Sequence, residues 1–305
     1  MLGLGRKMEL WRRESELPGP STVRLVETIS QESQRRFHSR ANVQDRGAAG
    51  NPILGEAVAA ESLLGRDTDQ FRSGQQAQTD LSIGIVVPVL NESKTLRYFL
   101  SRLYEVSRGR YPVVVVDGGS TDDSARIARQ FFHTEVISTA SRGMQLNHGA
   151  RGLFTDVLLF LHADSELPRG FDFHIQRALA DPGVFGGCFR LEFDVHHSLL
   201  KFYAWFTKFP GRFFHYGDQA FFIRRETFGV MGGFSALPFL EDVDFSRRLK
   251  RLGRFAVLPT RVRTSARRFM KRGVVRQQFA NILLVTLFEF GVSAGRPAKF
   301  YQRVR

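Results

Sequence analysis

Short apolar runs alternate with segments of helical spacing along the chain from Leu81 onward. Leu96, Leu100 and Leu103 share one face of such a segment, as expected for a helix that packs on a sheet. The apolar runs are rich in β-branched residues and predict buried strands at 81–90, 113–116, 135–138 and 157–161. Strand, helix and strand at this spacing imply right-handed crossovers. We therefore predict an α/β fold whose sheet is mainly parallel and flanked by helices.

The first 80 residues lack this pattern and contain only two Phe and one Trp. So little apolar area cannot offset the entropy of ordering the chain, and we expect a mostly disordered extension with short helical pieces at 23–36 and 54–64. No apolar core follows the basic start, and acids arrive as early as Glu9, which argues against a secretory signal and weakens a transit-peptide hypothesis. A start codon placed too far upstream is the alternative explanation.

The net charge of +14 is concentrated at one end of the 305-residue chain. It is zero over residues 1–80, −1 over 81–244 and +15 over 245–305. A nucleic-acid binder usually spreads such charge over a face, so we expect no nucleic acid; an anionic ligand or an anionic membrane surface fits equally well. The single cysteine, Cys188, excludes an intramolecular disulfide and a cysteine-rich zinc site. It favours a reducing compartment, and we predict a cytoplasmic protein.

An apolar segment at 274–292 is interrupted by Arg276, Gln277 and Glu289, which makes it too polar for a membrane-spanning helix. Phe279, Leu283, Leu287 and Phe290 share one side of the expected helix, and basic residues flank it. Residues 271–305 therefore resemble an interfacial helix at the inner face of the cell membrane. The alternative is that the same side packs on the folded domain.

Polar clusters follow three of the predicted strands, at 91–93, 117–123 and 162–165. Ligands of parallel sheets bind beyond the carboxyl ends of the strands, so these clusters predict a binding site. Each cluster taken alone could instead cap a helix or form a turn.

Seven segments, in this order, resemble glycosyltransferase family 2: PVLNES, VVDGGSTDDS, SRGMQLNHGA, LHADS, GDQAFFIRRETF, GGF and LEDVDFSRRLKRLG. The resemblance covers 81–270 and implies the GT-A fold, with a Rossmann-like sheet. It also implies inverting transfer of a sugar from a UDP- or GDP-sugar to a hydroxyl acceptor, small or lipid-linked, with Mn²⁺ or Mg²⁺. The HAD form, the GDQ block and the SARRF stretch look most like a bacterial subgroup associated with arsenosugar biosynthesis gene neighbourhoods.

The resemblance also assigns roles to individual residues. Gly118 stands where many relatives have a second Asp, and His162-Ala163-Asp164 stands where the family has its Asp-x-Asp metal motif. The implied catalytic base is Asp242. The implied metal ligands are Asp164 and His162, and the acceptor or phosphate side holds Asp218, Glu241 and Arg268. The implied donor-binding residues are Pro88, Asn91, Glu92, Asp117, Gly118, Ser120, Arg142, Gly143 and Asn147.

Two other functions remain open at this stage. A catalytically silent nucleotide-sugar-binding module is compatible with the reduced metal motif. A sugar nucleotidyltransferase would share the sheet topology, but it requires a glycine-rich basic loop after the first strand, where this chain has Asn91-Glu92-Ser93. The joint presence of Asp164 and Asp242 favours an enzyme.

Overall fold

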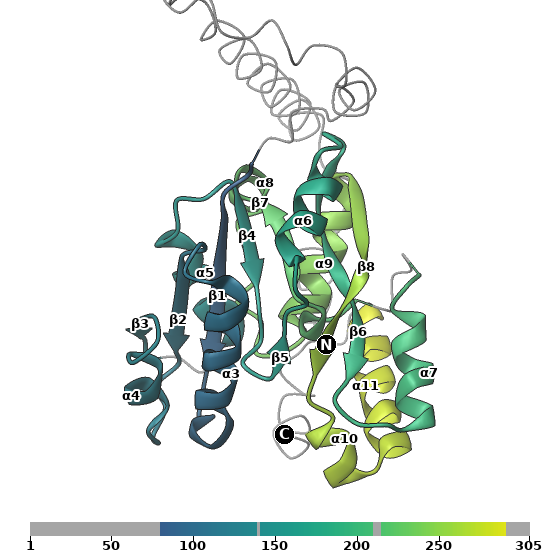
Figure 1. The fold of residues 1–305 in the computed structure, drawn as a ribbon. Helices are drawn as coiled ribbons and strands as arrows, with labels where there is room; N and C mark the ends of the chain where they lie inside the picture. Colours follow the sequence, from purple (N-terminus) through teal and green to yellow (C-terminus); the bar gives the residue numbers. More distant parts are fainter. Residues whose placement is uncertain (1–79, 139–140, 210–214, 291–305) are drawn as a thin grey trace, which may run out of the picture. The chain divides into compact units, whose positions relative to one another are not determined.

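The computed structural model describes residues 80–138, 141–209 and 215–290. The described chain contains an eight-stranded sheet of order β3-β2-β1-β4-β7-β6-β8-β5, with helices on both faces (Figure 1). The strands are β1 (Ile83–Val89), β2 (Val113–Asp117), β3 (His133–Val136), β4 (Val157–Phe160), β5 (Ser165–Glu166), β6 (Val184–Phe193), β7 (Phe221–Arg224) and β8 (Arg254–Thr264). The four predicted strands correspond to β1 to β4, with ends displaced by at most two residues.

The first half of the sheet is parallel throughout. β1 lies between β2 and β4 and runs parallel to both, and β3 pairs in parallel with β2. β7 runs antiparallel to β4 and to β6, while β6 and β8 pair in parallel with each other. The prediction of a mainly parallel α/β sheet is confirmed.

Helices cover both faces of the sheet and pack their apolar sides against it. On one face α3 buries Leu96, Leu100 and Leu103 against β1 side chains, and α6 shares the same apolar cluster. On the other face α5 approaches β1 so closely that a Cβ at Gly149 would lie 2.6 Å from a methyl group of Val86. The helices are α3 (Ser93–Ser107), α4 (Ser124–Ala128), α5 (Arg142–Arg151), α6 (Phe171–Leu179), α7 (Ser198–Phe206), η1 (Gly217–Gln219), α8 (Arg225–Val230), α9 (Glu241–Leu252), α10 (Arg267–Arg272) and α11 (Val274–Glu289).

β1, β2 and β4 end at the same edge of the sheet because they run in parallel. The chain leaves β1 towards β2 on one side and returns to β4 on the other, so this edge contains a topological switch point. Open α/β sheets bind ligands at such points. The three polar clusters predicted to converge do follow these three strands.

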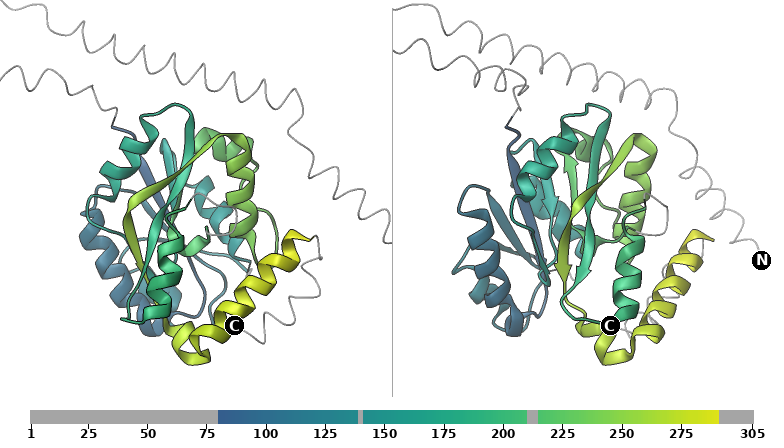
Figure 2. Two further views of the ribbon diagram at one scale, coloured as in Figure 1. Left: turned by 90° about the vertical axis from the view of Figure 1, so that its right-hand side faces the viewer. Right: turned by 45° about the vertical axis from the view of Figure 1, so that its right-hand side comes forward.

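α7, α10 and α11 lie together beyond the β6 and β8 strands, as two further views show (Figure 2). Leu200 of α7 packs with Ala266 and Val274 in a small apolar cluster of their own. No helix among the described residues is both long and apolar enough to cross a membrane. The predicted extension before Asp80 and the last part of the predicted tail, 291–305, lie outside the described residues.

Candidate active site

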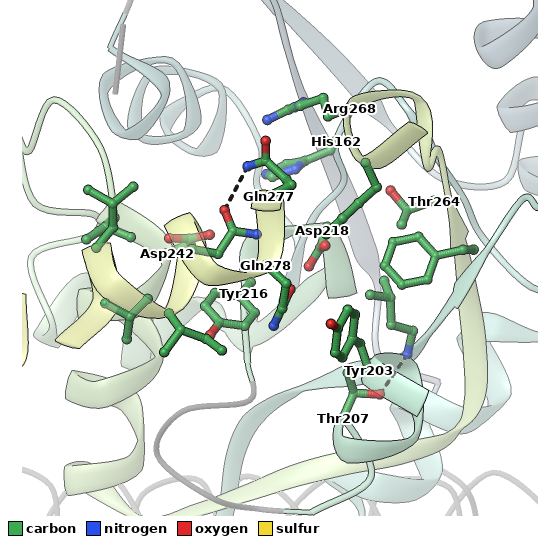
Figure 3. Close-up of a pocket in the computed structure, with 18 of the residues that line it drawn as sticks. His162, Tyr203, Thr207, Tyr216, Asp218, Asp242, Thr264, Arg268, Gln277 and Gln278 are labelled. Atoms are coloured by element: carbon green, nitrogen blue, oxygen red, sulfur yellow. Dashed lines mark hydrogen bonds between the residues drawn. The ribbon is translucent and has the colours of Figure 1, made fainter. Parts of the chain in front are cut away.

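A cavity of about 660 Å³ adjoins the carboxyl-end edge of the sheet (Figure 3). One part of its wall is charged and comes from strand ends and helix starts. The other part is apolar and comes mainly from α7 and α11. Seven of the predicted site residues line this one cavity: Arg142, His162, Asp164, Asp218, Glu241, Asp242 and Arg268.

Asp242 lies in the first turn of α9, and the backbone holds its carboxylate in place. The Gly217 N–H donates to Oδ2 at 2.8 Å, and the Val243 N–H donates to Oδ1 at 2.8 Å. The positive end of the α9 dipole favours a carboxylate here. The residue before the helix, Leu240, has a φ of 60°, a left-handed conformation that costs a non-glycine residue free energy. Asp242 is thus an oriented carboxylate on the cavity wall.

Gly217 brings Asp242 close to the proposed metal-motif histidine. A Cβ at Gly217 would lie 2.7 Å from Nε2 of His162 and 3.3 Å from Cβ of Asp242. A larger residue would displace the His162 ring, because real Cβ atoms essentially never come within 3.0 Å of another heavy atom. The GDQ segment therefore joins the strand-end cluster to the start of α9.

Asp218 is the most perturbed acid of the cavity. Burial raises its pKa to about 7, and the charges of Asp242 and Asp164 add to this shift while Arg268 and Arg142 oppose it. Its Oδ1 is buried without a hydrogen-bond partner. Burial also raises the pKa of Tyr216, followed by the charges of the same two neighbours, Asp242 and Asp218. The cavity thus concentrates negative charge that its own cations only partly offset.

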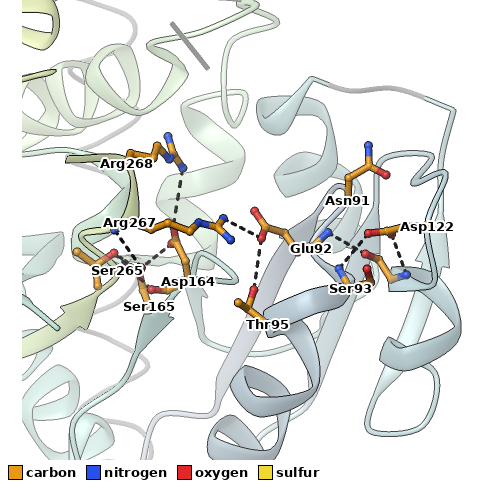
Figure 4. Close-up of polar contacts among 12 residues, drawn as sticks. Asn91, Glu92, Ser93, Thr95, Asp122, Asp164, Ser165, Ser265, Arg267 and Arg268 are labelled. Atoms are coloured by element: carbon orange, nitrogen blue, oxygen red, sulfur yellow. Dashed lines mark hydrogen bonds and ion pairs between the residues drawn. The ribbon is translucent and has the colours of Figure 1, made fainter. Parts of the chain in front are cut away.

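Two arginines of α10 reach the acids at the sheet edge (Figure 4). Arg268 Nη2 lies 3.7 Å from Asp164 Oδ2, and Arg267 Nη2 lies 3.2 Å from Glu92 Oε2. Both guanidinium groups are about half exposed, so a polyanionic ligand can approach them. This places cationic donors beside the two carboxylates that follow β1 and β4.

Glu241 and Arg142 form a bridge between α9 and α5. The Glu241 carboxylate, 5% exposed, lies 3.5 Å from Arg142 Nη1. Asn147, one turn further along α5, donates to the Phe234 carbonyl and accepts from the Phe234 N–H, both at 2.8 Å. Its amide is therefore engaged in holding the loop before α9, and a Cβ at Gly143 would meet the Ser235 carbonyl at 2.8 Å. Asn147 and Gly143, predicted as donor-binding, shape the site through this loop.

The remaining predicted donor-binding residues form a neighbouring hydrogen-bonded cluster. Asp117 Oδ1 accepts from the N–H groups of Gly119 and Ser120, while its Oδ2 is buried without a hydrogen-bond partner. Asn91, with a φ of 54°, accepts from the Thr121 N–H at 2.8 Å. These bonds fix the ends of β1 and β2 to each other.

Two of the predicted residues act through the backbone. Pro88 lies inside β1 opposite Val116, and the Gly118 N–H donates to the Val89 carbonyl at 2.9 Å. Both keep the two strand ends in register.

The apolar wall and the contact of Arg267 with Glu92 were not predicted from the sequence. α7 supplies Phe202, Tyr203 and Phe206, and its aromatic run LLKFYAWF was the available signal. Arg267 is adjacent to the predicted Arg268, but only the fold shows that it reaches Glu92, 175 residues away. Gln277 of α11 was taken as an interruption of an apolar helix, whereas it lines the cavity.

The acids of the cavity do not form a complete metal site by themselves. No group of three or more His, Cys, Asp or Glu side chains among the described residues could hold a metal ion by itself. The Asp164 carboxylate and the His162 ring, with the charges of Asp218 and Asp242 near them, nevertheless fit a cation that takes further oxygen ligands from a bound diphosphate.

Comparisons with known proteins agree with this architecture. The family model described as Glycosyl transferase family 2 matches residues 84–237, half of the chain. No curated protein shows significant sequence similarity to the chain.

Two solved structures share the fold. One is a mannosyltransferase, PcManGT from Pyrobaculum calidifontis, in complex with GDP-Man and Mn²⁺; it is 18% identical, with a TM-score of 0.50 over 85% of this chain and 72% of that one. The other is S. aureus TarS 1-349 in complex with UDP-GlcNAc, 15% identical, with a TM-score of 0.50 over 61% of this chain and 58% of that one. The chain spans 37% to 66% of the length of the TarS chains that it matches. The sheet is that of the GT-A glycosyltransferases.

Proposed function

The chain belongs to glycosyl transferase family 2, and from this membership and the cavity we propose that it transfers a sugar, with inversion, from a UDP- or GDP-sugar to a hydroxyl acceptor. The observation that carries the proposal is the convergence of Asp164, Asp218, Asp242 and Arg268 on one cavity at the sheet edge. TarS and PcManGT, which share the fold, were solved with UDP-GlcNAc and GDP-Man.

The donor base and ribose would lie over the cluster at the ends of β1 and β2. The unpartnered Oδ2 of Asp117 is an acceptor for the imide N–H of a uracil-type or guanine base. Asn91 and Glu92 flank it, and Arg267 and Arg268 stand within reach of a diphosphate placed beside Glu92 and Asp164. Arginine suits this task because its planar group contacts phosphate through two N–H donors.

Asp242 serves as the base in this proposal. The acceptor oxygen attacks the anomeric carbon, the bond from that carbon to the diphosphate oxygen breaks, and the hydroxyl proton passes to the Asp242 carboxylate. The products are the glycosylated acceptor and a nucleoside diphosphate. The two backbone N–H groups that hold Asp242 leave each oxygen a lone pair for this proton. Glu241, paired with Arg142, keeps the first turn of α9 in position.

Asp164 and His162 would hold the divalent cation together with the diphosphate. The cation would stabilise the charge that develops on the leaving diphosphate. Asp164→Asn should therefore abolish turnover while the melting temperature stays close to that of the wild type. Turnover that persists in excess chelator would contradict the metal role.

We extend the proposal to residues 271–305, which we expect to contact an anionic membrane surface at the inner face of the cell membrane. Phe279 is 67% exposed and Leu283 39%, while Leu284 and Val285 on the other side of α11 are buried. The side predicted to be apolar thus faces outward, which favours the interfacial alternative over packing on the domain. Sedimentation with anionic vesicles at low and high salt tests this contact. The finer resemblance to the subgroup associated with arsenosugar gene neighbourhoods stays a prediction.

A donor panel tests the central proposal. UDP- and GDP-sugars with tritium in the sugar are incubated with the full chain, Mn²⁺ and a lipid extract, and both nucleoside diphosphate and labelled acceptor are measured. We expect release with at least one donor and none above background from Asp242→Asn. Nucleotide binding without release from any donor would identify a silent binding module. Pyrophosphate release from a nucleoside triphosphate and a sugar phosphate would identify a nucleotidyltransferase.

A further inference from the structure

The apolar wall of the cavity is larger than a sugar acceptor alone requires. Phe202 and Phe206 of α7 and Ile282 and Val285 of α11 line the same space as Asp218 and Asp242. A small hydrophilic acceptor would leave these side chains in contact with water, whereas an apolar chain would displace that water at a gain of about 0.8 kcal/mol for each buried CH₂. The wall therefore suits a ligand with an apolar part.

The same cavity contains two buried acceptor oxygens without hydrogen-bond partners. One is Oδ1 of Asp218, and the other is Oε1 of Gln277, whose residue is only 8% exposed. The Gln277 amide nitrogen donates to Asn281 at 3.0 Å, which orients the side chain and leaves Oε1 as its open acceptor. A buried acceptor without a donor destabilises the protein, so a ligand that supplies O–H groups would recover this free energy.

The helices that form the apolar wall are also apolar on their exposed sides. Phe202 is 55% exposed, Trp205 50%, Ile282 52% and Val275 64%. The Lys208 ammonium lies 3.8 Å from the centre of the Trp205 ring, an arrangement typical of cations at the edge of an apolar surface. These exposed apolar side chains would contact the apolar chain of a ligand that extends from a lipid layer, and the acids of the cavity would contact its head group.

From these observations we infer that the cavity between α7 and α11 binds the acceptor, and that this acceptor is an amphiphile with a hydroxylated head group and an apolar chain. The head-group hydroxyls lie against Asp218, Gln277 and Asp242, and the chain lies along Phe202 and Ile282. This inference rests on the proposed function, because it makes the charged wall the place where the acceptor hydroxyl reacts.

An alkyl glucoside series tests the binding mode directly. Methyl, hexyl, heptyl and octyl β-glucosides share one head group, and their binding to the full chain is measured by calorimetry and by Trp fluorescence below their micelle-forming concentrations. Each buried CH₂ should tighten binding about fourfold, from 0.8 kcal/mol each. Methyl glucoside should bind too weakly to detect. Equal affinity along the series would overturn the inference.

A matched pair of variants separates the cavity from the outer apolar surface. Val275 and Ile282 are seven residues apart on α11, so they lie on nearly the same side of the helix, and both are more than half exposed. Only Ile282 lines the cavity. Ile282→Asp should weaken octyl glucoside binding at least tenfold, whereas Val275→Asp should leave it unchanged. Equal losses would mean that the alkyl chain of the glucoside binds the outer surface. Unchanged binding in both variants would also contradict the inference. Because both positions are exposed, both variants should fold, and circular dichroism checks this.

The donor panel keeps the inference separate from the proposed function. Glucoside binding that tightens with alkyl chain length, without sugar transfer from any nucleotide sugar, would support the amphiphile site and refute the transferase. Transfer to a short hydrophilic acceptor, with turnover independent of chain length, would support the transferase and refute the amphiphile site.

Discussion

Replacement of Asp242 by Asn separates the chemistry of this site from its stability. The amide oxygen of Asn can still accept the N–H of Gly217, the bond that measures 2.8 Å in the native protein. The variant loses the proton acceptor, one negative charge and the hydrogen bond from the Val243 N–H, because the amide nitrogen of Asn cannot accept it. A missing general base lowers the turnover number by about 10² to 10⁴-fold, or about 3 to 5 kcal/mol of transition-state free energy.

The expected cost to folding is much smaller. The lost interaction of a charge with the α9 dipole is worth about 0.3 to 1 kcal/mol, and the lost hydrogen bond about 0.5 to 1.5 kcal/mol. For a domain of this size, the two losses together lower the melting temperature by at most about 10 °C. Loss of the charge also removes a cause of the raised pKa of Asp218, so that pKa should fall below its native value of about 7.

Asp244, two residues further along α9, is the matched control. Its Oδ2 accepts from Arg248 Nε at 2.7 Å and from the Ser235 hydroxyl, and it does not line the cavity. Asp244→Asn should cost about 1.5 kcal/mol or more in stability, because a hydrogen bond to a charged partner is weakened, and should change turnover less than tenfold. Calorimetric melting, steady-state turnover and nucleoside diphosphate binding are measured on both variants. Near-normal turnover in Asp242→Asn with intact donor binding would refute the assignment and move the base to Asp218 or Glu241.

Three further changes probe other parts of the site. Asp117→Asn keeps an oxygen for the turn at Gly119 but turns an N–H towards the donor base, so calorimetry should show nucleoside diphosphate binding at least tenfold weaker with little loss of stability; unchanged affinity would contradict the base contact. Gly217→Ala should displace His162 and lower turnover, with a stability cost of about 1 to 3 kcal/mol in thermal melting; wild-type turnover would show that the close approach has no role. Burial lowers the pKa of His215 to about 4, whereas an unfolded His has a pKa of about 6.5. Between these two pH values the unfolded state binds more protons than the folded state. The contribution of His215 to the free energy of unfolding is therefore fully present above pH 6.5 and falls by up to about 3 kcal/mol as the pH drops to 4. Urea unfolding at several pH values should show this slope in the wild type and a shallower one in His215→Phe; equal slopes would refute the cause.

The strands that position the charged wall were predictable because their sequence pattern is local. β1, β2 and β4 consist mainly of β-branched and aliphatic residues, and a parallel sheet aligns their carboxyl ends without further information. The acids that follow them therefore converge for a reason that the sequence alone supplies. Asp242 needed more, because three acids occur in the first turn of α9 and only the family resemblance singled it out.

The apolar wall was not predictable in the same way. α7 is apolar or aromatic at most positions, so its spacing does not show which side chains face the core. Tyr203 and Leu200 pack inward while Phe202 and Trp205 stay exposed, and this division depends on α10 and α11, which come some 70 residues later. A contact between segments so far apart leaves no periodic signal in either of them.

In the folded protein, part of the positive charge concentrated after residue 245 lies beside the acids at the sheet edge. Arg267 and Arg268 reach Glu92 and Asp164, acids that follow the first and fourth strands. Pairs as exposed as these are worth at most about 1 kcal/mol each, so they contribute little to holding the C-terminal helices on the domain. Both arginines can therefore exchange a carboxylate for a donor phosphate at small cost, since a phosphate offers the same bidentate geometry and more charge. The segment that supplies the apolar wall for the proposed acceptor thus also carries cations to the proposed donor side, so the proposed transferase site and the proposed membrane contact share the C-terminal helices.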